Sequence, residues 1–106
     1  MNNVCYTIVI KQETCQNGIS KVINNTYTNV VVNTEILLNF GYNLKCINNT
    51  STQCIVQILN DIYIPSLTFS IYNESYKIFD LPCECGSYRV YIGVTLGSCA
   101  DSCCVS

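Results

Sequence analysis

The sequence predicts an all-β fold, an antiparallel β-sandwich or jelly roll of about eight strands with a terminal arm. Three observations predict it. Short segments rich in β-branched and aromatic residues recur at roughly 8–12-residue spacing, with turn signals between them. Several of these segments alternate apolar with polar residues. No window carries the i, i+3, i+4, i+7 apolar stripe of an amphipathic helix.

In the first half of the chain, turn signals bound the strand-prone segments. Residues 4–10 are β-branched and aromatic, and the Asn17-Gly18 pair that follows is typical of a two-residue hairpin turn. Gly41 and the polar run at 48–51 end later segments. The expected strands are residues 4–10, 19–23, 27–32, 36–40 and 44–47.

The second half of the chain continues this pattern. Residues 67–72 and 87–96 alternate with a period of two, and the second of these gives the strongest strand signal in the chain. We expect Pro65 to end the short strand before it, because proline cannot donate to a sheet ladder. Asn73-Glu74 is expected to form a hairpin turn. The expected strands are residues 54–59, 62–64, 67–72, 76–79 and 87–96.

A single domain is expected over residues 1–106, with a short cysteine-bearing N-terminal segment and a C-terminal tail at 98–106. This length is enough for one core and too short for two. No apolar run reaches the ~18–20 residues that a transmembrane helix needs. The first residues lack the basic segment of a signal peptide. We therefore expect no membrane span, and either an already mature chain or a route out of the cytosol that uses no recognisable signal peptide.

Cysteine is the most informative residue type. The chain has nine cysteines, a fraction typical of a disulfide scaffold, and such bonds persist outside the reducing cytosol. Because nine is an odd number, at least one cysteine cannot pair within the chain. That cysteine is expected to form a bridge between chains, although a free reactive thiol or a buried free cysteine would also satisfy the count.

Position along the chain divides the cysteines into two groups. Terminal cysteines suit an arm that crosses to a neighbour, and the adjacent Cys103 and Cys104 rarely bond to each other, because the peptide between them would be strained. We expect Cys5, Cys103 and Cys104 to bridge subunits after an arm has added as a strand to a sheet edge. The cysteines expected to bridge within a subunit or laterally are Cys15, Cys46, Cys54, Cys83, Cys85 and Cys99.

Charged residues are sparse. Five basic and seven acidic residues give a net charge of −2, which argues against a nucleic-acid partner, since such a partner needs a basic face. A monomer normally keeps more surface charge for solubility. The low charge therefore indicates that much of the surface meets other protein.

The sequence lacks the side chains that most catalytic sites use. It contains no histidine, which excludes Cys-His and Ser-His-Asp nucleophilic systems. Its five glycines are scattered and form no phosphate-binding loop. We expect no catalytic residues, no cofactor and no enzymatic activity.

A metal site with thiolate ligands is the more specific alternative to disulfide bonds. Cys83, Cys85, Cys99 and Cys103 have the ligand type that zinc and copper(I) prefer. The Cys83-x-Cys85 spacing is tighter than an ordinary zinc knuckle. Disulfides therefore account for the spacing better than a metal does.

The pattern resembles the subunits of endospore appendages, or spore pili, which are disulfide-linked fibres on bacterial spores. Cys5, then Thr7-Ile8-Val9, then Cys15 is similar to that family's N-terminal connector running into a first strand, and residues 87–96 are similar to its closing strand. The resemblance implies a jelly-roll subunit that is made in the mother cell without a signal peptide and bridged through cysteines to a neighbouring helical turn. In that family the adjacent cysteine pair lies in the connector, whereas here it lies near the C-terminus.

Together these observations predict a structural subunit that assembles with copies of itself into a disulfide-crosslinked, pilus-like helical filament. The resemblance implies an extracellular location on the spore surface. One alternative is a secreted monomeric module that binds through the loops at 48–53 and 82–86 and through exposed tyrosines. The other alternative is the thiolate metal-binding protein.

Overall fold

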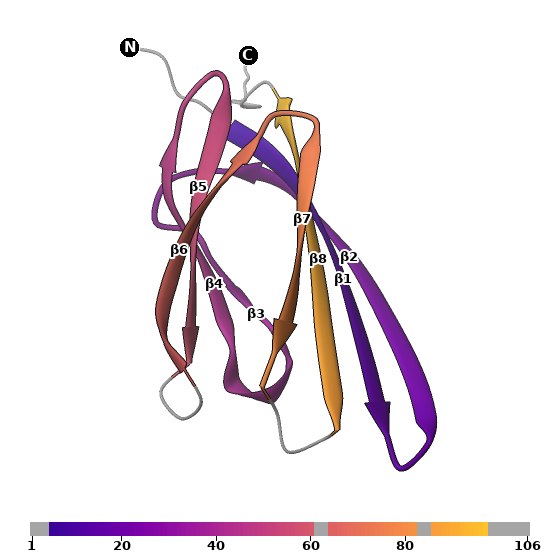
Figure 1. Ribbon diagram of the computed structural model, residues 1–106. Coiled ribbons are helices and arrows are strands. Elements are labelled where there is room, and N and C mark those ends of the chain that lie inside the picture. The colour runs from indigo at the N-terminus through magenta and orange to yellow at the C-terminus, as the bar shows by residue number, and fades with distance from the viewer. Residues whose placement is uncertain (1–4, 61–63, 83–85, 98–106) are drawn as a thin grey trace.

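The structure is a computed structural model that describes residues 5–60, 64–82 and 86–97. The predicted all-β class is confirmed, because these residues form two antiparallel sheets of four strands each (Figure 1). Between β3 and β4 the chain makes one turn of 3-10 helix, η1 (Asn39–Gly41). The described part of the chain contains no helix of the length and apolarity that crossing a membrane requires. The strands are β1 (Cys5–Gln16), β2 (Ile19–Val30), β3 (Glu35–Leu37), β4 (Asn43–Asn49), β5 (Gln53–Asn60), β6 (Ile64–Tyr72), β7 (Ser75–Leu81) and β8 (Ser87–Gly97).

Most strands that follow one another in the chain are neighbours in a sheet, except where the chain passes from one sheet to the other, between β2 and β3 and between β6 and β7. Sheet A has the order β2-β1-β8-β7, and sheet B has the order β3-β4-β5-β6. The chain therefore starts sheet A, builds all of sheet B as a meander, and returns to finish sheet A. β1 pairs with β8 along its whole length, from Cys5 opposite Gly97 to Cys15 opposite Ser87. This pairing joins the first and last described strands in the middle of sheet A.

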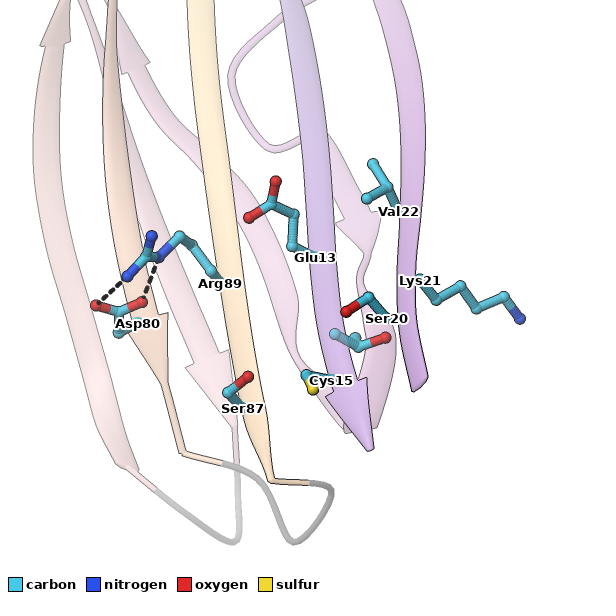
Figure 2. A pocket seen from close by; sticks show the side chains of 9 residues that line it. Glu13, Cys15, Ser20, Lys21, Val22, Asp80, Ser87 and Arg89 are labelled. Atoms are coloured by element: carbon cyan, nitrogen blue, oxygen red, sulfur yellow. Dashed lines mark hydrogen bonds and ion pairs between the residues drawn. The ribbon is translucent and has the colours of Figure 1, made fainter. Parts of the chain in front are cut away.

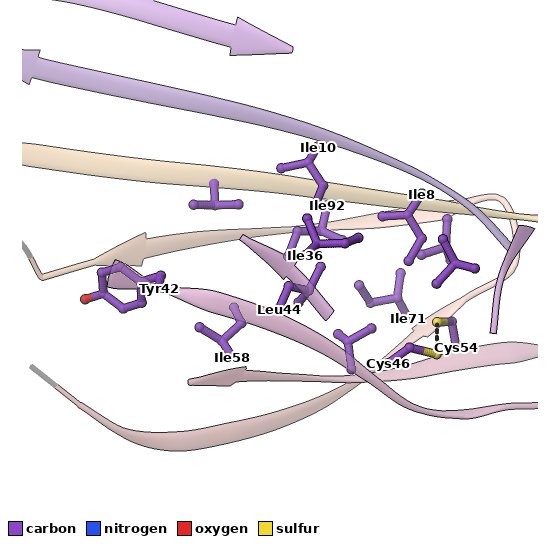
Figure 3. Packing of buried hydrophobic residues seen from close by; sticks show 14 of the residues in the cluster. Ile8, Ile10, Ile36, Tyr42, Leu44, Cys46, Cys54, Ile58, Ile71 and Ile92 are labelled. Carbon is purple, nitrogen blue, oxygen red and sulfur yellow. Dashed lines mark hydrogen bonds between the residues drawn. The ribbon is translucent and has the colours of Figure 1, made fainter. Parts of the chain in front are cut away.

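One hydrophobic core lies between the two sheets, and the period of two along each strand fills it. In β1, Tyr6, Ile8 and Ile10 point inward and are at most 1% exposed, whereas Val9 between them is 46% exposed. Burying an aliphatic side chain of this size stabilises the fold by about 1.5–3 kcal/mol. Figure 3 shows Ile8 and Ile10 facing Ile36, Leu44 and Ile71 of sheet B. The other buried members are Val30, Ile36, Tyr42, Leu44, Cys46, Cys54, Val56, Ile58, Ile71, Leu81, Tyr88, Val90, Ile92 and Val94.

The hairpin signals in the sequence are confirmed. Asn17 and Gly18 both have positive φ, 54° and 77°, as a type I′ turn requires, and they join β1 to β2. Asn73 and Glu74 form the turn between β6 and β7, with Glu74 at φ 64°. These two turns set the registers of the strands that they connect.

Two predicted strands prove to be one. Residues 19–23 and 27–32 were expected to be separate, but β2 runs unbroken from Ile19 to Val30. The intervening Asn24, Asn25 and Thr26 pair with β1 opposite Lys11, Ile10 and Val9. Because pairing with a long neighbour satisfies the backbone groups, it overrides the low strand propensity of asparagine.

Pro65 does not end a strand, contrary to expectation. β6 begins at Ile64 and continues through Pro65 to Tyr72. β6 is an outer strand of sheet B, and an edge position lets proline turn its missing N–H away from the ladder. The strand expected at 62–64 otherwise lies outside the described residues.

The strand expected at 36–40 is shorter than predicted. β3 ends at Leu37, and the chain turns through η1, where Phe40 has φ 60°. The backbone N–H of Asn39 donates to Gln12 Oε1 at 2.9 Å. This hydrogen bond removes a donor that a longer β3 would need for its ladder.

Candidate functional site

The cysteines are the candidate functional residues, and the structure divides them by exposure. Cys15 is exposed, whereas Cys46 and Cys54 are buried, and all three carry free thiols. The remaining predicted bridging residues, Cys83, Cys85, Cys99, Cys103 and Cys104, lie outside the described residues. The alternative four-thiolate metal set lies there too. Within the described residues, no group of three or more cysteine, aspartate or glutamate side chains is placed to hold a metal ion.

Cys5 has no exposed thiol to offer a neighbouring subunit. It is 2% exposed at the start of β1, and it is disulfide-bonded in a structure that holds a single chain. The sequence placed Cys5 among the cysteines that bridge subunits. A buried sulfur that is already bonded offers no free thiolate to a neighbouring subunit, so Cys103 and Cys104 remain the terminal bridging candidates.

Cys46 and Cys54 come together in the core, from adjacent strands β4 and β5. Their Sγ atoms lie 4.0 Å apart, and Cys46 Sγ is also 3.0 Å from Asn49 Oδ1 (Figure 3). The sequence grouped both residues as bridging candidates without pairing them. Cys54 hydrogen bonds to Cys46 and thereby lowers the pKa of the Cys46 thiol, while the same contact together with burial raises the pKa of Cys54.

Cys15 lies in an open hollow of about 410 Å³ on the outer face of sheet A, near the tip of the β1–β2 hairpin (Figure 2). Side chains from all four strands of sheet A line this hollow. Figure 2 shows Glu13, Ser20, Ser87 and Arg89 around it, with Lys21 pointing away. The thiol is thus presented at the surface rather than enclosed.

The outer face of sheet A carries exposed ion pairs. Arg89 Nε lies 2.7 Å from Asp80 Oδ1, and Lys11 Nζ lies 3.2 Å from Glu13 Oε2. Tyr91 connects the second pair to the sheet, because its hydroxyl donates to Glu13 Oε1 at 3.2 Å and its ring centroid lies 4.9 Å from Lys11 Nζ. Such exposed pairs contribute about 0–1 kcal/mol each. They mark this face as solvated.

Sheet B is very different in charge. Its described strands carry only Glu35 and Lys45, which face each other across β3 and β4 and so cancel. Exposed large apolar side chains occur on both sheets, such as Leu37 and Tyr72 on sheet B and Ile19 and Tyr76 on sheet A. The sheets therefore differ in charge, and depletion of charged residues is typical of the centre of a protein–protein interface.

β2 is an outer strand of sheet A and is exposed along most of its length. In Figure 1 the β1–β2 hairpin extends past the end of sheet B, which leaves Ile19 71% exposed and Val22 49% exposed. An outer strand presents a row of backbone N–H and C=O groups to which another strand can pair. This long edge is therefore the natural site for strand addition.

Sequence reasoning missed the hollow and the charge difference between the two sheets. The period of two in residues 87–96 already placed Arg89 and Tyr91 on one face of their strand, whereas Glu13 and Cys15 lay beyond the strand expected at 4–10. It gave no sign that β1 would pair with β8, which brings Glu13 opposite Arg89 and Cys15 opposite Ser87. Comparisons with protein-family models, curated proteins and solved structures found no match for this chain. Its class is therefore defined by its own fold, an eight-stranded β-sandwich with buried and exposed thiols.

Proposed function

We propose that this protein is a structural subunit, without enzymatic activity, that assembles with copies of itself into a disulfide-crosslinked fibre outside the cell. The observation that carries the proposal is the scarcity of charge on sheet B, whose described strands bear one pair of opposite charges, Glu35 and Lys45. A surface of this kind is poorly suited to an isolated monomer. It suits burial against other subunits.

Strand addition followed by covalent bridging is the proposed mode of assembly. The exposed edge of β2 offers backbone groups to an arm from a neighbouring subunit. Cys15 lies on β1 beside this edge and carries an exposed free thiol. We propose Cys15 as one lateral bridging residue, together with Cys103 and Cys104 from the sequence prediction. The bridges then lock a geometry that strand pairing has already set.

The proposed location is the surface of a bacterial spore, where the subunit would form a pilus-like appendage. The support is the resemblance of residues 5–15 and 87–96 to the connector and closing strand of endospore appendage subunits. In the structure these two segments are paired strands in the centre of sheet A. An arm near the paired chain ends would leave the edges of both sheets open to neighbours.

The test is a denaturing gel of native material, run with and without reductant. Covalent assembly predicts a ladder or a band too large to enter the gel, which collapses to the 11.8 kDa chain only when reductant is added. A single monomer band in both lanes would contradict the fibre. The expected contrast arises because a bridge between chains survives heat and detergent but not thiol reduction.

A matched pair of variants separates the bridging thiol from the others. Cys15→Ser is expected to shift the unreduced ladder toward smaller species, because it removes an exposed thiol. Cys46→Ser/Cys54→Ser is expected to leave the ladder unchanged, since both residues are buried and neither is exposed to a neighbouring subunit. An identical ladder for Cys15→Ser and the unaltered protein would remove Cys15 from the proposal while leaving the fibre itself in place.

A second candidate function is a monomeric binding module. It is favoured by Tyr72 and Tyr76, which flank the β6–β7 turn and are 63% and 65% exposed. Exposed tyrosines offer a large contact area together with a hydrogen-bonding hydroxyl. A monomer band in both gel lanes would favour this candidate.

A further inference from the structure

We infer that Cys46 and Cys54 form a disulfide within each subunit, which links β4 to β5 inside the core. The inference does not rest on the proposed fibre, because both sulfurs belong to one chain and point between its own sheets. It assigns a covalent cross-link to two residues that the structure holds as thiols.

The register of β4 and β5 places the two side chains side by side. Cys46 lies opposite Val56 and Asn49 lies opposite Cys54, with a β-bulge between Cys46 and Asn48. Both cysteines point inward, so their Sγ atoms approach to 4.0 Å. A disulfide requires about 2.05 Å, and rotation of two cysteine side chains on neighbouring strands supplies the difference of roughly 2 Å.

The surroundings favour this pairing over any other. Cys46 is 2% exposed and Cys54 is 0% exposed, so a thiol of another molecule cannot reach either one in the folded chain. The turn between them is fixed, because Thr50 N–H donates to Gln53 O at 2.9 Å and Tyr6 donates to Thr50 O at 2.7 Å. The two sulfurs are therefore held together rather than meeting by chance.

The chemistry is thiol–disulfide exchange with a small-molecule disulfide as the oxidant. The Cys46 thiolate attacks the small disulfide, forms a mixed disulfide and releases one small thiolate. The Cys54 thiolate then attacks the Cys46 sulfur and releases the second small thiolate. The protein loses two protons and two electrons, and the small disulfide is reduced to two thiols. Because both sulfurs are buried, the exchange precedes closure of sheet A over sheet B.

Mass analysis of the full chain tests the inference. The reduced protein is refolded with oxidised glutathione, unfolded in guanidinium with iodoacetamide but no reductant, and cleaved with trypsin. Trypsin cuts after Lys45 and Lys77, so both cysteines fall in the fragment of residues 46–77. That fragment is expected without alkylation and about 2 Da lighter than its reduced form, because ring closure removes two hydrogens. Alkylation of either cysteine, or attachment of the fragment to glutathione or another peptide, would overturn the inference.

Thermal unfolding gives a second, independent readout. Adding reductant is expected to lower the Tm of the unaltered protein by about 10 °C more than it lowers that of Cys46→Ala/Cys54→Ala, since only the former loses this cross-link. The same comparison with Cys15→Ser, which keeps the buried pair, is expected to match the unaltered protein. Equal falls in the unaltered protein and the double variant would count against the disulfide. The mass analysis decides the question even if the double variant does not fold.

Discussion

Three tyrosines place their hydroxyl groups at the border of the core, and each hydroxyl has a partner. Tyr6 donates to Thr50 O, Tyr42 donates to Pro82 O, and Tyr88 donates to Gln12 Oε1. Satisfying a buried hydroxyl avoids the desolvation cost of leaving it unpaired. Each bond also ties together residues far apart in the sequence. The tyrosines thus determine how loops and turns close over the core.

Replacing Tyr88 by phenylalanine is expected to lower the free energy of unfolding by about 1 kcal/mol, because Gln12 Oε1 loses one of its two donors. Burial raises the pKa of Tyr88 in the folded state. The unaltered protein should therefore lose stability above a pH of about 10, where an unfolded tyrosine ionises, and Tyr88→Phe should lose less. Urea unfolding followed by circular dichroism measures both effects, since the chain has no tryptophan.

The matched control for this substitution is Tyr76→Phe, because Tyr76 is exposed. It should leave the free energy of unfolding unchanged. If the two variants were indistinguishable, the hydrogen bond from Tyr88 to Gln12 would not contribute to stability.

At the scale of single elements, the turns depend on backbone conformation as much as on strand pattern. Gly18 has φ +77° in open space at the tip of the β1–β2 hairpin. Gly86 has φ +116° just before β8, and an added Cβ there would lie 2.5 Å from Cys15 O. Both positions favour glycine, and at Gly86 the close approach of the β1 backbone adds a steric requirement. The start of β8 therefore packs against the end of β1 only when residue 86 has no side chain.

Alanine substitutions at three glycines should follow this ranking. Gly97→Ala should change the free energy of unfolding by less than about 0.5 kcal/mol, because its Cβ would meet nothing closer than Thr7 Oγ1 at 3.7 Å. Gly18→Ala should cost about 1–2 kcal/mol for a left-handed backbone. Gly86→Ala should cost more than either, because strain and a steric clash add. Denaturant unfolding of the three variants would expose an error in this reasoning if Gly86→Ala were the mildest.

At the scale of the whole molecule, the two sheets differ in the surface that they present. Sheet A carries ion pairs on its outer face, while the described strands of sheet B carry only the opposite charges of Glu35 and Lys45. Sheet A also ends in the long exposed edge of β2. An assembly that buries sheet B and extends from β2 would leave the ion-paired face in water.

Placing a positive charge on the β2 edge should suppress assembly without unfolding the subunit. Val22→Lys is expected to reduce the amount of protein that sediments as large species by tenfold or more, because a lysine on an outer strand opposes the addition of another strand. A tenfold change corresponds to about 1.4 kcal/mol in the free energy of association. Sedimentation velocity measures the effect, and circular dichroism checks the fold.

Val9→Lys serves as the control, since Val9 on the inner strand β1 is exposed to a similar extent, 46% against 49% for Val22. It should assemble as the unaltered protein does. Equal loss of assembly in both variants would show that strand addition at β2 is not the mode of contact.

The fold class could be predicted because its signals are local. The alternation in residues 87–96 and the Asn17-Gly18 turn each depend on neighbours within a few positions, and both are confirmed in the structure. Where distant partners decide the outcome, prediction was wrong, as at the gap between residues 23 and 27 and at Pro65. At residues 24–26, pairing with β1 satisfies the backbone groups that local propensity would have left unpaired. At Pro65, the edge position of β6 means that the missing N–H costs no hydrogen bond in the sheet. The candidate site was harder to predict, because the cysteines differ in burial and their spacing along the sequence does not reveal which of them are buried.

The sequence by itself determined that the protein is all-β, that its strands have one apolar face each, and that it has no histidine for the commonest catalytic chemistry. It also determined that nine cysteines cannot all pair within one chain. Only the tertiary structure decided that β1 pairs with β8, that Cys46 and Cys54 meet in the core, and that Cys15 stays at the surface. The physical reason is the distance along the sequence over which each feature is set. Periodicity and turns depend on adjacent residues, whereas contacts between distant residues form only when the strands pair and the two sheets pack.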